Sequence, residues 1–209
     1  MIKYLLFDLD NTLYSCRNGL EELVGRRIRE FAAAFLGTTA EEAWRQRMAV
    51  VQQYGTCLEW LVEEKGLIDV EAYLSAVHPP NEADSLVPDI ALRAFLSGIS
   101  LPKAILTNSP REHADLFLGK LGISDLFTHV FDIRQCSFRG KPRKEVYDNA
   151  LNALGLRAQE ALFIDDNPIY AERFAAMGGN ALLLDENDVH TNYALPKIRE
   201  LGELTRYIS

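Results

Sequence analysis

Near its start the chain reads Ile2-Lys3-Tyr4-Leu5-Leu6-Phe7-Asp8-Leu9-Asp10-Asn11-Thr12. The nearly unbroken apolar run predicts a strand that is covered on both faces, as in a parallel sheet. Asp8 and Asp10 follow it directly, and residues two apart in an extended chain point to the same side. Because open α/β sheets bind ligands at the carboxyl ends of their strands, this stretch predicts a binding site that contains two carboxylates.

Similar short apolar runs recur later in the chain and alternate with helical patterns. Strands are expected at 103–106, 161–164 and 181–184, and helices at about 110–121, 143–154 and 168–177. Strands that alternate with helices predict the α/β class, with a doubly wound, Rossmann-like parallel sheet.

Residues 15–87 interrupt this alternation. They read as helices at about 18–36, 40–54, 56–65 and 69–77. Thr39 with Glu42 fits a capping box, and Tyr54-Gly55-Thr56 fits a helix stop followed by an N-cap. We therefore expect an α/β core formed by 1–14 and 88–209, with 15–87 inserted as a helical cap. A helix-rich edge of a single domain would give a similar pattern.

A second polar cluster, Thr107-Asn108-Ser109, follows the strand expected at 103–106. Ser109 fits the N-cap of the next helix, with Pro110 as the first helical residue and Glu112 as the capping-box partner. Free amides at a helix start, together with the Thr107 hydroxyl, also suit a phosphate oxygen.

Two further clusters supply a cation and more carboxylates. Lys141 is flanked by Gly140 and Pro142, which restrict the backbone just before a helix, and a lysine there can neutralise an approaching phosphate. Asp165 and Asp166 end another apolar strand, where adjacent acids repel unless a cation or a proton intervenes. Mg²⁺ prefers such oxygen ligands, although the acids would also favour the dipole of a helix that Asn167 caps.

Composition excludes several classes of function. The net charge of −8 argues against non-specific nucleic-acid binding, and no apolar stretch approaches the roughly 20 residues of a membrane span. Three scattered cysteines without CxxC spacing fit reduced thiols. We therefore expect a soluble, cytoplasmic protein that binds neither nucleic acid nor membrane. The histidines share no metal-ligand spacing, which predicts surface or packing roles for His78, His113, His129 and His190.

Taken in order, the four clusters resemble the motifs of the haloacid dehalogenase superfamily. The resemblance implies that Asp8 attacks the phosphoryl group to form an aspartyl-phosphate, and that Asp10 acts as general acid and base. It further implies that Thr107, Lys141 and Asn108 hold the phosphoryl group. A Mg²⁺ cofactor would be bound by Asp8, the backbone carbonyl of Asp10, Asp166 and Asp165.

A finer resemblance is to the pyrimidine 5′-nucleotidase-like phosphatases. It rests on Asp8-Leu9-Asp10-Asn11-Thr12-Leu13-Tyr14, on Tyr54-Gly55-Thr56 followed by Leu58, and on Phe163-Ile164-Asp165-Asp166. Asp10 favours a phosphatase, since dehalogenases have no use for an acid at that position. Cys57, Trp60 and Tyr170 depart from the pattern, which leaves the substrate and the surroundings of the metal open. Candidates to face the substrate are Arg17, Asn18, Thr56 and Trp60, although Trp60 fits the core of the cap better.

These observations predict a Mg²⁺-dependent phosphomonoester hydrolase that acts on a small phosphorylated metabolite. Nucleoside 5′-monophosphates are the expected substrates, with pyrimidine nucleotides favoured. Two alternatives stay open: a sugar-phosphate or phosphoglycolate-type phosphatase or phosphomutase, and a non-catalytic protein of the same fold that binds phosphoesters.

Overall fold

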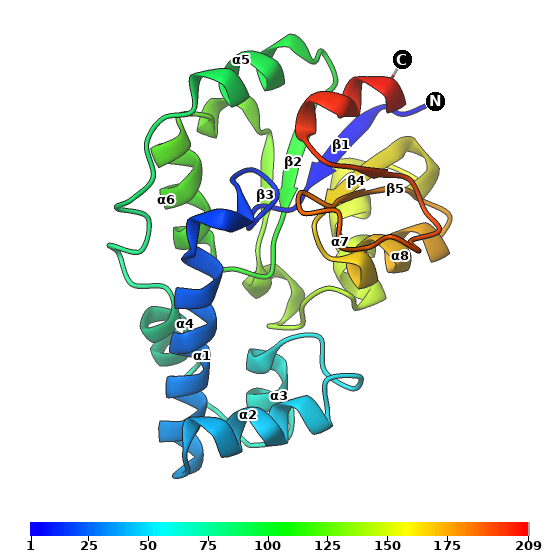
Figure 1. Cartoon of the computed structure of the whole chain (residues 1–209). Helices are drawn as coiled ribbons and strands as arrows, with labels where there is room; N and C mark the ends of the chain where they lie inside the picture. The colour runs from blue at the N-terminus through cyan, green and yellow to red at the C-terminus, as the bar shows by residue number, and fades with distance from the viewer. Residues whose placement is uncertain (209) are drawn as a thin grey trace.

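The computed structural model describes residues 1–208, which contain a parallel sheet with the strand order β3-β2-β1-β4-β5-β6 (Figure 1). The strands are β1 (Tyr4–Phe7), β2 (Lys103–Leu106), β3 (His129–Phe131), β4 (Ala161–Asp165), β5 (Asn180–Leu184) and β6 (Lys197–Ile198). The predicted doubly wound α/β fold is confirmed. The sequence patterns missed β3 and β6, because two or three residues are too few to show an apolar period.

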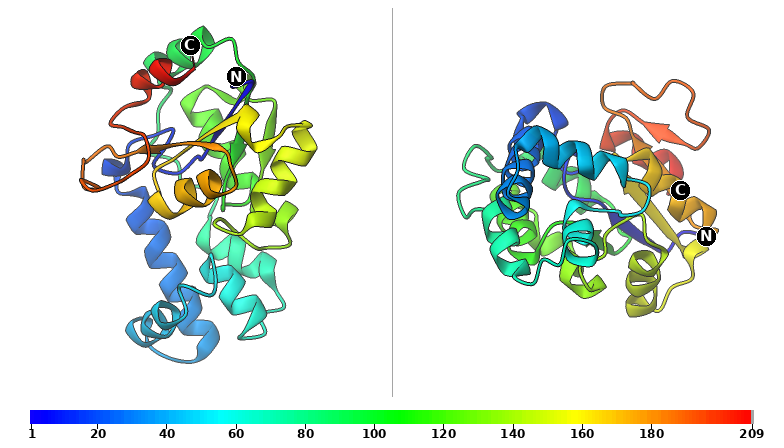
Figure 2. Two further views of the ribbon diagram at one scale, coloured as in Figure 1. Left: turned by 90° about the vertical axis from the view of Figure 1, so that its right-hand side faces the viewer. Right: turned by 90° about the horizontal axis from the view of Figure 1, so that it is seen from below.

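Helices cover both faces of the sheet (Figures 1 and 2). One face packs against α5 (Ile90–Gly98) and α6 (Arg111–Leu121), and the other against α7 (Lys144–Leu154) and α8 (Pro168–Ala176). Strand β1 serves both layers, since Leu5 belongs to the first cluster and Leu6 to the second. Side chains alternate across a strand, so a strand buried on both faces must be apolar throughout.

A group of four helices lies beyond one end of the sheet (Figures 1 and 2). They are α1 (Leu20–Leu36), α2 (Ala40–Ala49), α3 (Cys57–Glu63) and α4 (Val70–Val77). Their inward faces form a separate hydrophobic cluster that includes Ala43, Trp60 and Tyr73. All four predicted helices are present, with α2 and α3 shorter than expected, whereas the division into core and cap stays a prediction. Within residues 1–208 no helix is both long and apolar enough to cross a membrane.

The predicted helix caps are confirmed only in part. The Thr39 side chain accepts a hydrogen bond from the Glu42 amide, but the Glu42 carboxylate binds Arg45, so half of the capping box forms. The assignment of Ser109 as N-cap is wrong, because α6 begins at Arg111 after Pro110 without a side-chain cap. The Ser109 hydroxyl instead donates to Asp10 at 2.8 Å, so a tertiary contact replaced the local one.

Gly179 provides a test of the packing between α8 and β5. A Cβ atom there would lie 2.3 Å from the Phe174 ring, which is fully buried against Tyr147 and Phe163. Because that ring cannot move aside, Gly179→Ala should lower the free energy of unfolding by about 1–3 kcal/mol in denaturant titrations.

Gly119→Ala is the matched control. Gly119 lies on an exposed part of α6, and nothing stands within 4 Å of the Cβ it lacks. Alanine is the better helix former, so this change should stabilise the protein by up to about 1 kcal/mol. Equal unfolding midpoints for the two variants would contradict the packing argument.

Candidate active site

Most of the polar clusters singled out in the sequence meet at the carboxyl ends of three adjacent strands. Asp8 follows β1, Thr107 follows β2, and Asp165 is the last residue of β4. Strand β1 pairs with both β2 and β4, and Phe7 lies opposite Ile164 in the register. The next residues along these two strands are therefore Asp8 and Asp165, which brings their carboxylates together.

The buried ammonium group of Lys141 lies between these two carboxylates. Its Nζ donates to Asp8 Oδ1 at 2.6 Å and to Asp165 Oδ2 at 2.7 Å, and the residue is only 1% exposed. Burial alone would lower the pKa of Lys141, but the charges of Asp165 and Asp8 and their hydrogen bonds raise it above its ordinary value. Lys141 is therefore a fixed positive charge in the site.

A third carboxylate completes an acidic group around this lysine. Oxygen atoms of Asp8, Asp165 and Asp166 all lie within 4.8 Å of one another. Burial raises the pKa of Asp8, and burial together with the charge of Asp165 raises the pKa of Asp166 to about 7. If all three acids are ionised beside one lysine, negative charge is in excess, and this all-oxygen donor set fits a divalent cation such as Mg²⁺ that would balance it. Asp165 is the acid most engaged with protein groups, since it also accepts from the Asn167 amide.

Asn108 holds the loop that carries Lys141. Its Oδ1 accepts from the Lys141 amide at 2.7 Å, and its Nδ2 donates to the Lys141 carbonyl at 3.3 Å. Thr107 is buried beside it, and its Oγ1 accepts from the Ser109 amide at 3.0 Å. The structure thus brings the predicted phosphate-binding residues together, with the Asn108 side chain turned toward the backbone of Lys141.

Two glycines allow the turn before α3 to approach this loop. A Cβ on Gly55 would lie 2.7 Å from the Lys141 carbonyl oxygen, and one on Gly140 would lie 2.4 Å from Cγ2 of Thr56. Neither position has room for a side chain. Helix α3 is therefore anchored directly against the lysine loop.

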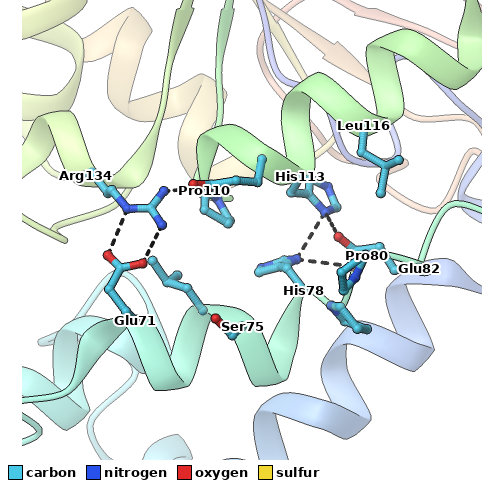
Figure 3. Close-up of a pocket in the computed structure, with 12 residues that line it drawn as sticks. Glu71, Ser75, His78, Pro80, Glu82, Pro110, His113, Leu116 and Arg134 are labelled. Atoms are coloured by element: carbon cyan, nitrogen blue, oxygen red, sulfur yellow. Dashed lines mark hydrogen bonds and ion pairs between the residues drawn. The ribbon is translucent and has the colours of Figure 1, made fainter.

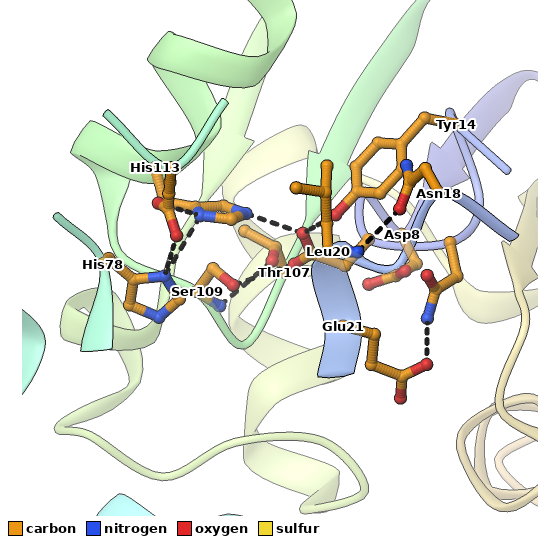
Figure 4. Close-up of polar contacts among 12 residues, drawn as sticks. Asp8, Tyr14, Asn18, Leu20, Glu21, His78, Thr107, Ser109 and His113 are labelled. Carbon is orange, nitrogen blue, oxygen red and sulfur yellow. Dashed lines mark hydrogen bonds and ion pairs between the residues drawn. The ribbon is translucent and has the colours of Figure 1, made fainter. Parts of the chain in front are cut away.

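Asp10 is held by three donors that lie apart from the lysine. Tyr14 donates to its Oδ1 at 2.6 Å and Ser109 to its Oδ2 at 2.8 Å, while His113 Nε2 lies 2.6 Å from Oδ1. Figure 4 shows the ring of His113 and the phenol of Tyr14 approaching from different elements. Burial would raise the pKa of Asp10, but the charge of His113 and these hydrogen bonds lower it further than burial raises it.

The network continues away from Asp10 into the segment after α4. His113 Nδ1 lies 2.6 Å from Glu82 Oε1, and Arg27 of α1 donates to Glu82 Oε2 at 2.9 Å. His78 Nδ1 lies 3.1 Å from His113 Nδ1, at one wall of a cavity of about 410 Å³ (Figure 3). Burial lowers the pKa of His113, yet the charges and hydrogen bonds of Asp10 and Glu82 raise it to about 10. Asp10, His113 and Glu82 therefore form a chain of alternating charge.

The structure corrects the prediction of surface or packing roles for two of the histidines, His78 and His113, whereas His129 is exposed as expected. His78 and His113 have little exposed side chain, both contact Glu82, and His113 also contacts Asp10. The sequence showed no metal-ligand spacing for these two histidines, because α5, β2 and the loops around them lie between His78 and His113. The one available signal was the four-residue interval from Ser109 to His113, which fits one face of the predicted helix, although in the structure only His113 lies in α6.

Of the four candidates to face the substrate, only Thr56 lines a cavity beside the site. This cavity of about 250 Å³ lies between helices α1–α4, the loop that carries Asn108 and the first turn of α8, which carries Tyr170. Arg17 instead binds Asn187, Asn18 accepts from the Leu20 amide, and Trp60 is buried in the cluster of α1–α4. Tyr170, noted as a departure from the family pattern, places its ring 5.2 Å from Lys141 Nζ.

Comparison with known proteins places the chain among phosphatase relatives. Residues 2–178 match the family model described as haloacid dehalogenase-like hydrolase. Phosphate metabolism protein 8 of Saccharomyces cerevisiae is 30% identical over 88% of this chain, and the match covers 62% of the yeast protein, so the chain spans under two thirds of that relative. Validoxylamine A 7′-phosphate phosphatase of Streptomyces hygroscopicus subsp. limoneus is 28% identical, with 80% of this chain and 78% of that protein covered.

A solved structure agrees on the fold. CbbY from Rhodobacter sphaeroides, in complex with xylulose-(1,5)bisphosphate, superposes with a TM-score of 0.68 at 19% identity. The match covers 98% of this chain and 96% of that one. At this identity the similarity shows the fold alone.

The charge of His113 can be tested by its titration. We expect the His113 ring to stay protonated through neutral pH and to lose its proton near pH 10 in an NMR titration of the imidazole nitrogens. Because this pKa lies above the unfolded value of about 6.5, His113 stabilises the fold fully below that pH. The stabilisation is lost as the pH rises through about 10, and His113→Asn should remove this dependence. A midpoint near 6.5 would contradict the charged chain.

Proposed function

Because the chain belongs to the haloacid dehalogenase-like hydrolase family, we propose that it is a Mg²⁺-dependent phosphatase that hydrolyses small phosphomonoesters through an aspartyl-phosphate on Asp8. The observation that carries the proposal is the buried Lys141 ammonium between Asp8 and Asp165. The Asp8 carboxylate and the phosphate of the substrate are both anions and repel each other. A permanent cation beside Asp8 reduces this repulsion and so favours the attack. The phosphatases among the relatives support the reaction type.

Asp8 is the proposed nucleophile. Among the described residues, the hydrogen bond to its side chain is the one that Lys141 donates to Oδ1. Oδ2 is therefore the atom that would attack phosphorus, while Lys141 offsets the repulsion between the carboxylate and the phosphoryl oxygens. Thr107 and the loop held by Asn108 would orient the phosphoryl group during transfer. Covalent transfer to Asp8 divides the hydrolysis into two easier steps.

Asp10 is the proposed general acid and base. Its carboxylate is bonded to His113, whose Nε2 lies 2.6 Å from Asp10 Oδ1 and donates a proton to it when the ring is charged. We propose that this proton reaches the leaving oxygen through Asp10, and that the pair regains a proton from water when the aspartyl-phosphate is hydrolysed. The charged ring of His113 lies between the carboxylates of Asp10 and Glu82. This arrangement suits the exchange of a proton between His113 and Asp10.

Mg²⁺ would be held by Asp8, Asp166 and the backbone carbonyl of Asp10, with Asp165 beside them bonded to Lys141. When bound, the ion supplies positive charge against the phosphoryl oxygens. Helices α1–α4 would act as a cap over the site, which the tight contacts of Gly55 and Gly140 support.

For the substrate we propose nucleoside 5′-monophosphates, with pyrimidine nucleotides favoured. The support is the Tyr54-Gly55-Thr56 element and a small cavity with an apolar wall, which is also lined by Ser109, the residue that donates to Asp10. Sugar phosphates and phosphoglycolate are the alternatives, as phosphatases for such compounds occur among the relatives. A phosphomutase would differ by returning its phosphoryl group to a second hydroxyl.

Phosphate release from a panel of esters tests the reaction. The panel comprises UMP, CMP, AMP, GMP, phosphoglycolate and several sugar phosphates, each with Mg²⁺. Asp8→Asn should lower turnover by more than about 10³-fold with an unchanged circular dichroism spectrum, because the nucleophile is lost. Asp115→Asn, which alters an exposed acid on α6, should match the wild type. Substantial hydrolysis by Asp8→Asn would remove Asp8 as nucleophile, and binding without release would favour a non-catalytic protein.

Metal removal tests the acidic group. Chelation with EDTA should abolish phosphate release and added Mg²⁺ should restore it, since the carboxylates of Asp8, Asp165 and Asp166 exceed the charge of Lys141. Asp166→Asn should raise the Mg²⁺ concentration for half-maximal activity by at least about tenfold. Activity that persists after chelation would rule out the metal assignment.

A further inference from the structure

Arg47 of α2 is a buried cation without an acidic partner. The residue is 6% exposed, and its Nη2 donates to the Tyr54 carbonyl at 3.0 Å. Its Nη1 is buried with no hydrogen-bond partner, and none of the described carboxylates forms an ion pair with it. Glu59, the buried acid of the adjacent α3, is already bound to Arg143 and to the Gly55 amide.

This arrangement is costly unless something else binds the guanidinium. Arginine cannot lose its proton in a protein, and an unpaired ion inside a protein costs several kcal/mol. The two nearby titratable groups stay neutral, because burial raises the pKa of Cys57 to about 11 and that of Tyr73 well above its usual value. The described residues therefore offer no anion to Nη1. The remaining acceptors for Nη1 are water or a ligand group in the cavity that Arg47 lines.

The place of Arg47 indicates which ligand group this would be. Arg47 lines the cavity of about 250 Å³, which Asn108 and Ser109 also line. Ser109 donates to Asp10, and Asn108 binds the backbone of Lys141. A phosphoryl group at Lys141 with its leaving oxygen at Asp10 would thus direct the leaving group into this cavity.

The residues that line the cavity indicate the chemistry of the rest of that leaving group. Val24, Ile28 and Trp44 of helices α1 and α2 contribute apolar surface, and Arg47 contributes the charged donor. A leaving group that fits has an apolar or flat body and an oxygen acceptor directed at the guanidinium. A leaving group with hydroxyls alone would leave the Arg47 charge poorly compensated.

We propose that Arg47 determines substrate specificity by binding a carbonyl or carboxylate oxygen on the leaving group of the phosphomonoester. The inference rests on the proposed phosphatase function, because it places the leaving group beside Asp10. Two sources present the same chemistry to the guanidinium: the carbonyl of a pyrimidine base and the carboxylate of a phosphorylated hydroxy acid. In both cases the acceptor completes the hydrogen bonding of Nη1.

Matched pairs of esters separate these sources. UMP is compared with ribose 5-phosphate, which lacks the base, and phosphoglycolate with ethyl phosphate, which lacks the carboxylate. Each pair is assayed with the wild type, Arg47→Met, Arg47→Lys and the control Arg45→Met. Arg45 lies on the same helix but is exposed and paired with Glu42. Arg45→Met therefore tests the effect of removing a positive charge from α2 alone.

For one of the two pairs, Arg47→Met should lower the ratio of kcat/KM between the two esters by about 10- to 100-fold, the loss expected for one charged hydrogen bond. Arg47→Lys should restore part of the ratio, and Arg45→Met should leave it unchanged. The pair that responds identifies the base or the carboxylate as the group bound. The melting temperature of Arg47→Met should not fall, since an apolar side chain replaces an unpaired buried charge.

An equal loss for both members of each pair, or no loss at all, would overturn the inference and assign Arg47 to the support of the Tyr54 carbonyl. Equilibrium binding of UMP and phosphoglycolate to Asp8→Asn, with and without Arg47→Met, separates this outcome from failure of the proposed function. If the wild type shows no turnover but ligand binding depends on Arg47, the inference about Arg47 stands and the proposed phosphatase function is rejected. If turnover depends on Asp8 but not on Arg47, the phosphatase function stands and the inference about Arg47 is rejected.

Discussion

The site depends on one buried contact, the ammonium group of Lys141 between Asp8 and Asp165. Parallel pairing of β1 with β4 brings two carboxylates to neighbouring strand ends, where burial and mutual repulsion would otherwise favour protonation. A cation must lie between them, and it must come from a loop whose path is fixed. Asn108 fixes that path through two hydrogen bonds to the Lys141 backbone, so the first, second and fourth strands all serve this contact.

A second line of charges leads from Asp10 toward the helices beyond the sheet. Asp10, His113, Glu82 and Arg27 alternate in sign, and each contacts the next at 2.6–2.9 Å. Alternation lets each buried charge stabilise its neighbours, which isolated ions in the same place could not do. Because Arg27 belongs to α1, the surroundings of Asp10 depend on the placement of that helix. The proposed acid and base is thus linked physically to the proposed cap.

The two buried cations beside the site, Lys141 and Arg47, differ in how completely they are paired with acceptors. Lys141 is fully paired, whereas Arg47 has one backbone acceptor and a nitrogen with none. Full pairing suits a group that must stay fixed through a reaction. Incomplete pairing costs stability and leaves a strong donor ready for a ligand, a trade-off that is common at functional sites.

The sequence by itself determined strands β1, β2, β4 and β5, most of the helices and the four polar clusters, because these depend on local periods and on the ends of strands. The apolar run before Asp8 required a strand buried on both faces, and the acids after it required a strand end. Only the tertiary structure decided that Ser109 binds Asp10 rather than capping its helix, and that His113 lies between Asp10 and Glu82. It alone decided that Nη1 of Arg47 has no hydrogen-bond partner among the described residues. These contacts join residues far apart in the chain, mostly by 30 to 100 positions, and nothing in the local sequence of either partner specifies the other.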